Sequence, residues 1–141
     1  MDFRVLLVFV MVFASWATAE IIKFIVDASV NKRADVRIFL GYGGFPSAHS
    51  ALVSSLCTSL LLIQGFSVSF AISLVLAGIV LRDTVTIRQY IDRNTKQIAR
   101  LSRHLTKEET EIELISHSLM EISVGIAIGI VVPAILYLVL L

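Results

Sequence analysis

The sequence predicts an all-α fold: an integral membrane helical bundle of four transmembrane spans with one amphipathic helix on the cytoplasmic side. Two observations carry this prediction. The 141 residues are 57% hydrophobic and 16% charged, with a mean hydropathy of +0.88, whereas soluble domains are about 25% charged. The apolar residues also gather into long runs between polar segments. We expect a single membrane domain over residues 1–141, without internal repeats.

The first apolar run, residues 5–27, is long enough to cross a hydrocarbon core of about 30 Å at about 1.5 Å per residue. Its beginning also resembles a secretory signal, because the small residues 17–19 would suit a cleavage site. The apolar pattern continues past that point to Val26. We therefore expect the segment to be retained, with cleavage of residues 1–19 as the alternative.

The next two spans are predicted at residues 47–64 and 66–82. Pro46 suits a helix start and Ser47 an N-cap, and the second span ends at Gln64-Gly65. This span is short, so we expect neighbouring helices to enclose it, with its serines and threonines facing protein.

The last span is predicted within residues 112–141. Gly125 and Gly129 have the spacing of a small-residue face against which another helix packs closely. Pro133 predicts a kink in this helix.

Charge is confined to the polar segments. Ten of the twelve Lys and Arg residues lie in residues 32–37 and 82–107, and four spans would place both segments on one side of the membrane. The positive-inside rule makes that side cytoplasmic. Apolar residues recur at three- and four-residue spacing in residues 84–105, which predicts an amphipathic helix that lies along the membrane surface or extends the third span.

A glycine-rich turn, residues 41–44, leads into the second span, whose first turn contains His49. Glycines allow backbone N–H groups to approach a ligand, and a helix N-terminus favours an anion. This stretch therefore predicts a phosphate site, and a tight loop without a ligand is the alternative.

Two further pairs of ionisable residues have helical spacing. Glu121 follows His117 by four residues, so the carboxylate can orient the imidazole while the other ring nitrogen reacts. Glu20 and Lys23 share a face of the first helix. They form either a helix-end ion pair or an arrangement that places Lys23 against an anion.

The segment Gly43-Gly44-Phe45-Pro46-Ser47-Ala48-His49-Ser50 resembles the Pro-Ser-x-His core of the type 2 phosphatidic acid phosphatase and vanadium haloperoxidase superfamily. It is most similar to the small divergent membrane branch of that superfamily. In that branch the core is followed by an Asp-containing segment that ends in Arg and then by His-x-x-x-Glu. Asp83 to Arg88 and His117 to Glu121 match these motifs in order, and the resemblance covers roughly residues 16–132.

The resemblance implies a metal-independent membrane phosphatase without a cofactor. It would hydrolyse a lipid or polyprenyl phosphomonoester, for example a phosphatidylglycerophosphate-type lipid, through a phosphohistidine. His117 would be the nucleophile, Glu121 would orient it, and His49 would protonate the leaving oxygen. The implied phosphate-binding residues are Ser47, Gly43, Gly44, Arg37, Arg88 and Lys23, with Asp83 in an orienting role.

The sequence departs from the family pattern in two places. Lys23 and Arg37 are fourteen residues apart and no Arg-Pro pair follows, and the middle motif keeps only Asp83 and Arg88. A catalytically degenerate lipid- or anion-binding adaptor is therefore the alternative function. A transporter component is a third, which the lack of an inverted repeat disfavours.

The remaining expectations concern ligands and partners. No Cys, His or carboxylate cluster has metal-ligand spacing, and Cys57 is expected to be inert packing. The expected partners are a phospholipid or polyprenyl phosphate and the membrane, with no nucleic acid, and a homo-oligomer is compatible with each interpretation.

Overall fold

The computed structural model describes residues 2–31, 44–106 and 119–140, and these residues form four helices. They are α1 (Phe3–Asn31), α2 (Ala48–Gln64), α3 (Val68–Thr106) and α4 (Leu119–Leu140). The described part of the chain contains no strand. The all-α prediction is therefore confirmed for the residues that the structure describes.

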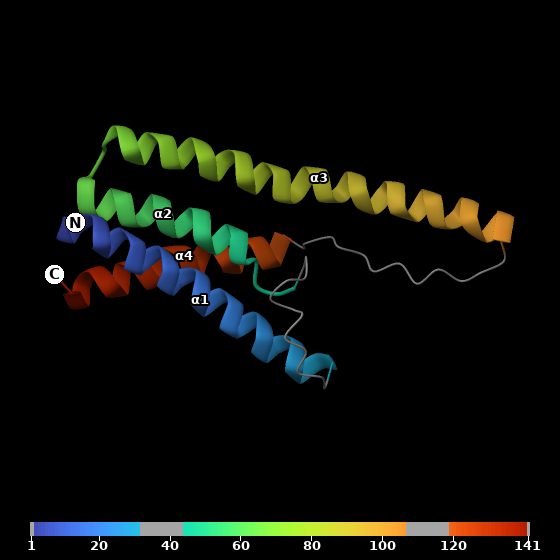
Figure 1. Cartoon of the computed structure of the whole chain (residues 1–141), viewed down its shortest axis with the longest axis horizontal. Coiled ribbons are helices and arrows are strands. Elements are labelled where there is room, and N and C mark those ends of the chain that lie inside the picture. The colour runs from blue at the N-terminus through green and yellow to red at the C-terminus, as the bar shows by residue number, and fades with distance from the viewer. Residues whose placement is uncertain (1, 32–43, 107–118, 141) are drawn as a thin grey trace.

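Helix α2 is the centre of the bundle. It packs against each of the other three helices, and α1 also packs against α4. Figure 1 shows α2 and α4 running in one direction and α1 and α3 in the opposite one, with the N- and C-termini at the same end. The start of α2, the start of α4 and the end of α1 all lie toward the other end of the bundle.

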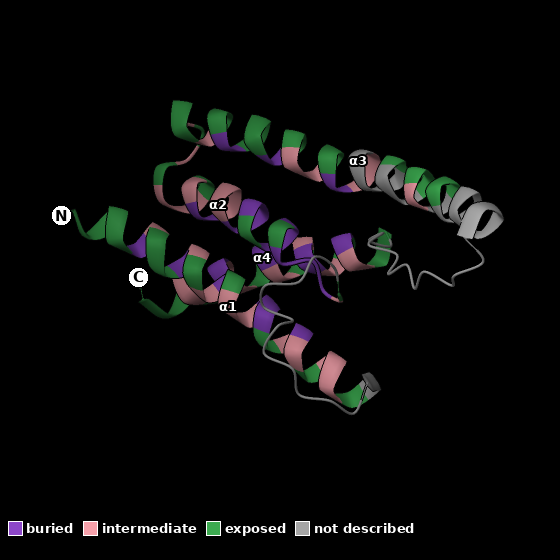
Figure 2. Cartoon of the chain, turned by 45° about the vertical axis from the view of Figure 1, so that its right-hand side comes forward, coloured by how far each residue is buried: buried purple, intermediate pink, exposed green. Residues whose placement is uncertain are grey.

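Three of the four described helices are long and apolar enough to cross a membrane: Phe3–Ser29 within α1, Val68–Thr86 within α3, and all of α4. Helix α2 is apolar but has only 17 residues, so the fourth predicted span is not confirmed. Its enclosure is confirmed, because α2 packs against the other three helices, and Figure 2 shows buried residues on all four.

The two ends of α2 are where the sequence predicted them. Ser47 is the N-cap, and its side chain accepts a hydrogen bond from the backbone N–H of Ser50. Gly65, the C-cap, has φ 65°, and its N–H donates to the carbonyl of Leu61 at 2.9 Å. Both caps satisfy backbone groups that a helix end leaves unpaired.

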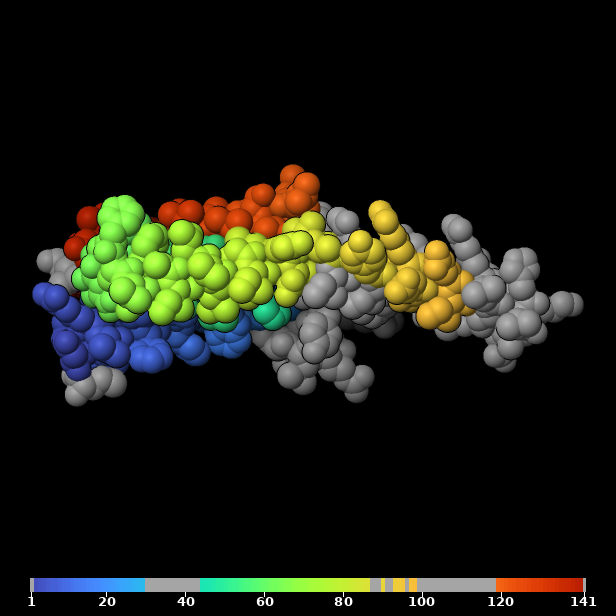
Figure 3. Space-filling model, turned by 90° about the horizontal axis from the view of Figure 1, so that it is seen from above, coloured from blue at the N-terminus to red at the C-terminus, as the bar shows by residue number. Residues whose placement is uncertain are grey.

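Helix α3 settles one alternative that the sequence left open. The polar segment 84–105 is helical and continues the third apolar segment as one 39-residue helix, rather than forming a separate element. No glycine or proline lies between Gly78 and Gly125 to interrupt it. Figures 1 and 3 show α3 passing over α2 and running on beyond it. The amphipathic character of this extension and its position at a membrane surface remain predictions.

Helices α2 and α4 meet along the predicted small-residue face. A Cβ atom added at Gly125 would collide with the carbonyl oxygen of Ser47, and one at Gly129 would lie 2.5 Å from the carbonyl oxygen of Ala51. The glycines are four residues apart and so are their partners. This register fits two helices that run in the same direction with their backbones in contact.

The described part of α4 begins at Leu119, so the predicted residues 112–118 of the last span lie outside the described residues. Helix α4 continues through Pro133, which is buried. The kink at this residue remains a prediction.

Small polar side chains fill much of the bundle interior, as expected where close packing replaces the hydrophobic effect between helices. Several of the buried hydroxyls donate to a carbonyl one turn earlier in their own helix, as Ser15 does to Met11 at 2.8 Å and Thr84 does to Val80 at 2.7 Å. The buried serines of α2 are Ser50, Ser54, Ser55 and Ser59.

Candidate anion site at the start of α2

The turn before α2 is attached to α4 through the backbone. The N–H of Ser47 donates to the carbonyl oxygen of Glu121 at 3.1 Å, and Gly125 leaves room for the Ser47 carbonyl one turn further along α4. Ser47 is 1% exposed. The Pro-Ser-x-His segment and the first turn of α4 therefore form one packed unit, although they are far apart in the sequence.

The hydroxyl of Ser47 has a defined hydrogen-bonding role. Its oxygen accepts from the N–H of Ser50 at 3.4 Å and from the Ser50 hydroxyl at 3.0 Å. A hydroxyl has two acceptor positions and one donor. With both acceptor positions in use, the Ser47 O–H is left to donate, and an anion oxygen is a suitable acceptor.

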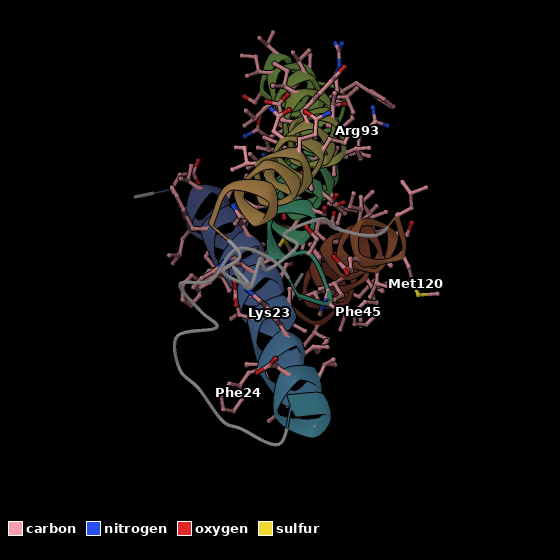
Figure 4. The ribbon with its side chains drawn as sticks, turned by 90° about the vertical axis from the view of Figure 1, so that its right-hand side faces the viewer. Lys23, Phe24, Phe45, Arg93 and Met120 are labelled. Carbon is pink, nitrogen blue, oxygen red and sulfur yellow. The ribbon has the colours of Figure 1, made fainter. Side chains whose placement is uncertain are left out.

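Lys23 lies across the glycine turn. Gly44 has φ 104°, and a Cβ atom added to it would lie 3.0 Å from Cε and 3.2 Å from Cγ of Lys23. The positive φ favours glycine here, and a Cβ atom would also require the Lys23 stem to shift by a few tenths of an ångström. Figure 4 shows Lys23 nearer than Phe24 to the segment that carries Phe45. The structure thus brings a cation from α1 to the turn before α2.

Lys23 is buried together with a carboxylate. Its Nζ atom lies 3.7 Å from Oε2 of Glu20, and the two residues are 6% and 8% exposed. The sequence left open whether this pair lies at a helix end at the interface or beside an anion. The pair is buried and Lys23 lies next to the glycine turn, and an anion facing Lys23 there stays a prediction.

The two described catalytic candidates occupy the first turns of neighbouring helices. His49 is exposed in the first turn of α2, and Glu121 is half-buried in the first turn of α4. The bond from Ser47 to Glu121 holds these two turns together. Because His49 is exposed, its side chain is accessible to a ligand at the start of α2.

The other predicted site residues are not brought into this geometry. Asp83 is exposed on α3. Arg88 belongs to the helical part of α3, but its side chain lies outside the described residues, as do Gly43, Arg37 and His117. The position of the nucleophile relative to the acid remains a prediction.

Within residues 2–31, 44–106 and 119–140, no three His, Cys, Asp or Glu side chains are grouped so that they could hold a metal ion.

Two contacts of the site were not predicted from the sequence. The Ser47 to Glu121 backbone bond and the bond between the Ser50 and Ser47 hydroxyls depend on how α4 packs on α2. The spacing of Gly125 and Gly129 could have indicated the Ser47 to Glu121 bond only in part. It gives the face of α4 that meets α2 but not which residues of the two helices lie opposite one another.

The fold and the site define a class: a helical integral membrane protein with a glycine turn, a capped helix start and a buried lysine at one end of its bundle. The chain belongs to the divergent PAP2 family, whose family model matches residues 6–132. The resemblance of the Pro-Ser-x-His segment to this family is therefore confirmed. The match covers α2, α3 and most of α1 and α4.

A curated relative is the uncharacterized membrane protein YuiD of Bacillus subtilis (strain 168), which is 32% identical over 84 residues. The matched stretch is 59% of this chain and 53% of YuiD, so it spans about half the length of that relative. No solved structure matches the chain.

Proposed function

We propose that the chain, as one membrane domain over residues 1–141, is a phosphatase that hydrolyses a phosphomonoester on a lipid or polyprenyl carrier. The observation that carries the proposal is Lys23 lying across Gly44 beside the start of α2. A buried cation, a Ser47 hydroxyl left to donate and a helix N-terminus together suit a phosphoryl group. Membership of the divergent PAP2 family supports the reaction class.

In the proposed reaction, a ring nitrogen of His117 attacks the phosphorus and the bond from phosphorus to the lipid oxygen breaks. His49 gives its proton to that oxygen, so that the lipid alcohol leaves. A water molecule then attacks the phosphohistidine with His49 taking its proton, and phosphate and free His117 are released. Glu121 orients the His117 ring.

The phosphoryl oxygens would be held by donors rather than by a metal ion. Besides Lys23 and Ser47, the proposed phosphate-binding residues are Gly43, Gly44, Arg37 and Arg88. Asp83 has an orienting role in this proposal. Arginine forks suit phosphate oxygens, and the electrostatic stabilisation that these groups offer is the main requirement of phosphoryl transfer. We place the site on the cytoplasmic side because the basic segments flank it.

The second candidate is a non-catalytic adaptor that binds a lipid head group or another anion at the same place. It is favoured by the middle motif, which keeps only Asp83 and Arg88, and by the exposure of Asp83 on α3. An adaptor needs Lys23 and the turn but not the nucleophile.

One experiment separates the two candidates. The purified protein in detergent is incubated with lipid phosphomonoesters without added metal, and released phosphate is measured for the wild type, His117→Ala and His104→Ala. The phosphatase predicts release that His117→Ala abolishes and that His104→Ala, at a histidine without a proposed role, retains. Full release in His117→Ala would refute the nucleophile, whereas lipid binding without release in the wild type would favour the adaptor.

A further inference from the structure

The Glu20 and Lys23 pair is close but not hydrogen-bonded. The distance from Nζ to Oε2 is 3.7 Å, longer than the about 2.7–2.9 Å of a charge-assisted hydrogen bond. The Oε2 atom is buried and has no hydrogen-bond partner in the described part of the chain. A buried carboxylate oxygen without a donor is costly, so this atom is suited to a donor that arrives with a ligand.

The spacing of the pair suits one oxygen atom between them. An oxygen can lie about 2.8 Å from both Nζ and Oε2 when those atoms are 3.7 Å apart. Toward the Lys23 ammonium, which has only donors, this oxygen must accept a hydrogen bond. Toward the carboxylate, which has only acceptors, it must donate one. A group that bridges the two must therefore carry an O–H, and a fully ionised oxygen does not fit.

We infer that Glu20 is a specificity-determining residue that accepts a hydrogen bond from the protonated oxygen of a phosphate monoanion. The same oxygen accepts from Lys23, whose stem lies on Gly44 at the proposed site. This inference rests on the proposed anion site. It adds that the site takes a phosphate that carries a proton and rejects an anion of similar shape that does not.

Inorganic phosphate and sulfate test this directly, because both are tetrahedral but only phosphate keeps a proton near neutral pH. Binding of each ion to the purified full-length protein in detergent is measured at about pH 6. We expect phosphate to bind at least about tenfold more tightly than sulfate, since sulfate leaves Glu20 without a donor and places two negative groups together. This comparison needs no variant and so does not depend on the folding of one.

The variant Glu20→Gln has nearly the same shape, and its amide can donate to an ionised oxygen. We expect it to bring the ratio of phosphate to sulfate affinity to about one, mainly by tightening sulfate. Asp27→Asn is the matched control, since it removes one carboxylate from the same helix. It should leave the ratio at the wild-type value, which excludes a general effect of net charge.

The outcomes are distinguishable. Equal binding of both ions by the wild type would overturn the inference and leave the anion site standing, with water as the bridge between Glu20 and Lys23. An unchanged preference in Glu20→Gln would also overturn it. If neither ion binds, the proposed anion site is itself refuted, and the role of Glu20 with it.

Discussion

The backbone N–H of Ser47 donates a hydrogen bond to the backbone carbonyl of Glu121 at 3.1 Å, and this bond joins the turn before α2 to the first turn of α4. The two residues belong to different motifs of the sequence. Because the bond involves backbone atoms, its geometry depends on how closely the two helices approach. Gly125 and Gly129 set that approach.

Gly125→Ala should therefore destabilise the protein and weaken the site together. Its methyl group would collide with the carbonyl oxygen of Ser47 and would lie 2.9 Å from Cβ of Ser50, so the helices must separate. We expect a cost of about 1–3 kcal/mol, seen as a lower midpoint of thermal unfolding in detergent, and a loss of phosphate release.

Gly78→Ala is the control for this substitution. Gly78 lies in α3, and a Cβ atom added there meets nothing within 4 Å. The unfolding midpoint should stay the same or rise slightly, because alanine favours a helix. If both variants unfold at the wild-type temperature, the close packing of α2 on α4 does not contribute to stability.

Gly44→Ala tests the contact with Lys23. The substitution forces a side chain into a residue with φ 104° and against the Lys23 stem at 3.0 Å. We expect phosphate affinity to fall by about tenfold, because the strained turn and the shifted Lys23 stem no longer hold the ammonium in the same position. Binding of inorganic phosphate to the purified protein measures the effect.

Gly65→Ala separates backbone strain from the loss of this contact. Gly65 also has a positive φ, 65°, but a Cβ atom there meets nothing within 4 Å. This variant should lose about 1 kcal/mol of stability and keep its phosphate affinity. An equal fall in affinity for both variants would show that strain alone, and not Lys23, explains the effect of Gly44→Ala.

Local features of this chain were predictable because the groups that determine them are neighbours in sequence. Ser47 caps α2 as predicted, and the helix ends at the predicted Gln64-Gly65, since helix ends depend on residues within one turn. The glycine face of α4 also followed from its four-residue spacing. The sequence could not choose between a separate surface helix and an extension of α3, because its amphipathic pattern fits both.

Nonlocal features were not predictable in the same way. The register between Ser47 and Glu121, and the position of Lys23 over Gly44, depend on how α1 and α4 cross α2. Periodicity gives the face that a helix buries but not the residue that it meets. The burial of Glu20 beside Lys23 could therefore be described from sequence only as two alternatives.

Ser47→Ala should weaken phosphate binding more than its effect on stability would suggest. It removes the cap acceptor, at a cost of about 1 kcal/mol, and it also removes the hydroxyl that is left to donate to an anion. Ser67→Ala is the matched control, because Ser67 accepts from the N–H of Phe70 at 3.2 Å at the start of α3. We expect both variants to lower the unfolding midpoint and only Ser47→Ala to weaken the binding of inorganic phosphate to the purified protein.

Lys23→Met should be among the most destabilising single changes in α1, because it leaves the buried Glu20 carboxylate without its cation. Removing one partner of a buried ion pair costs about 3–5 kcal/mol, whereas replacing both partners by neutral groups is often tolerated. The double variant Glu20→Gln, Lys23→Met should therefore regain most of the lost stability, measured as the unfolding midpoint in detergent. It should not regain phosphate binding, because Lys23 supplies the positive charge of the proposed site.

A double variant as unstable as Lys23→Met would show that the lysine stem packed on Gly44, and not the charge pair, carries the stability. A double variant that binds phosphate as tightly as the wild type would remove Lys23 from the site.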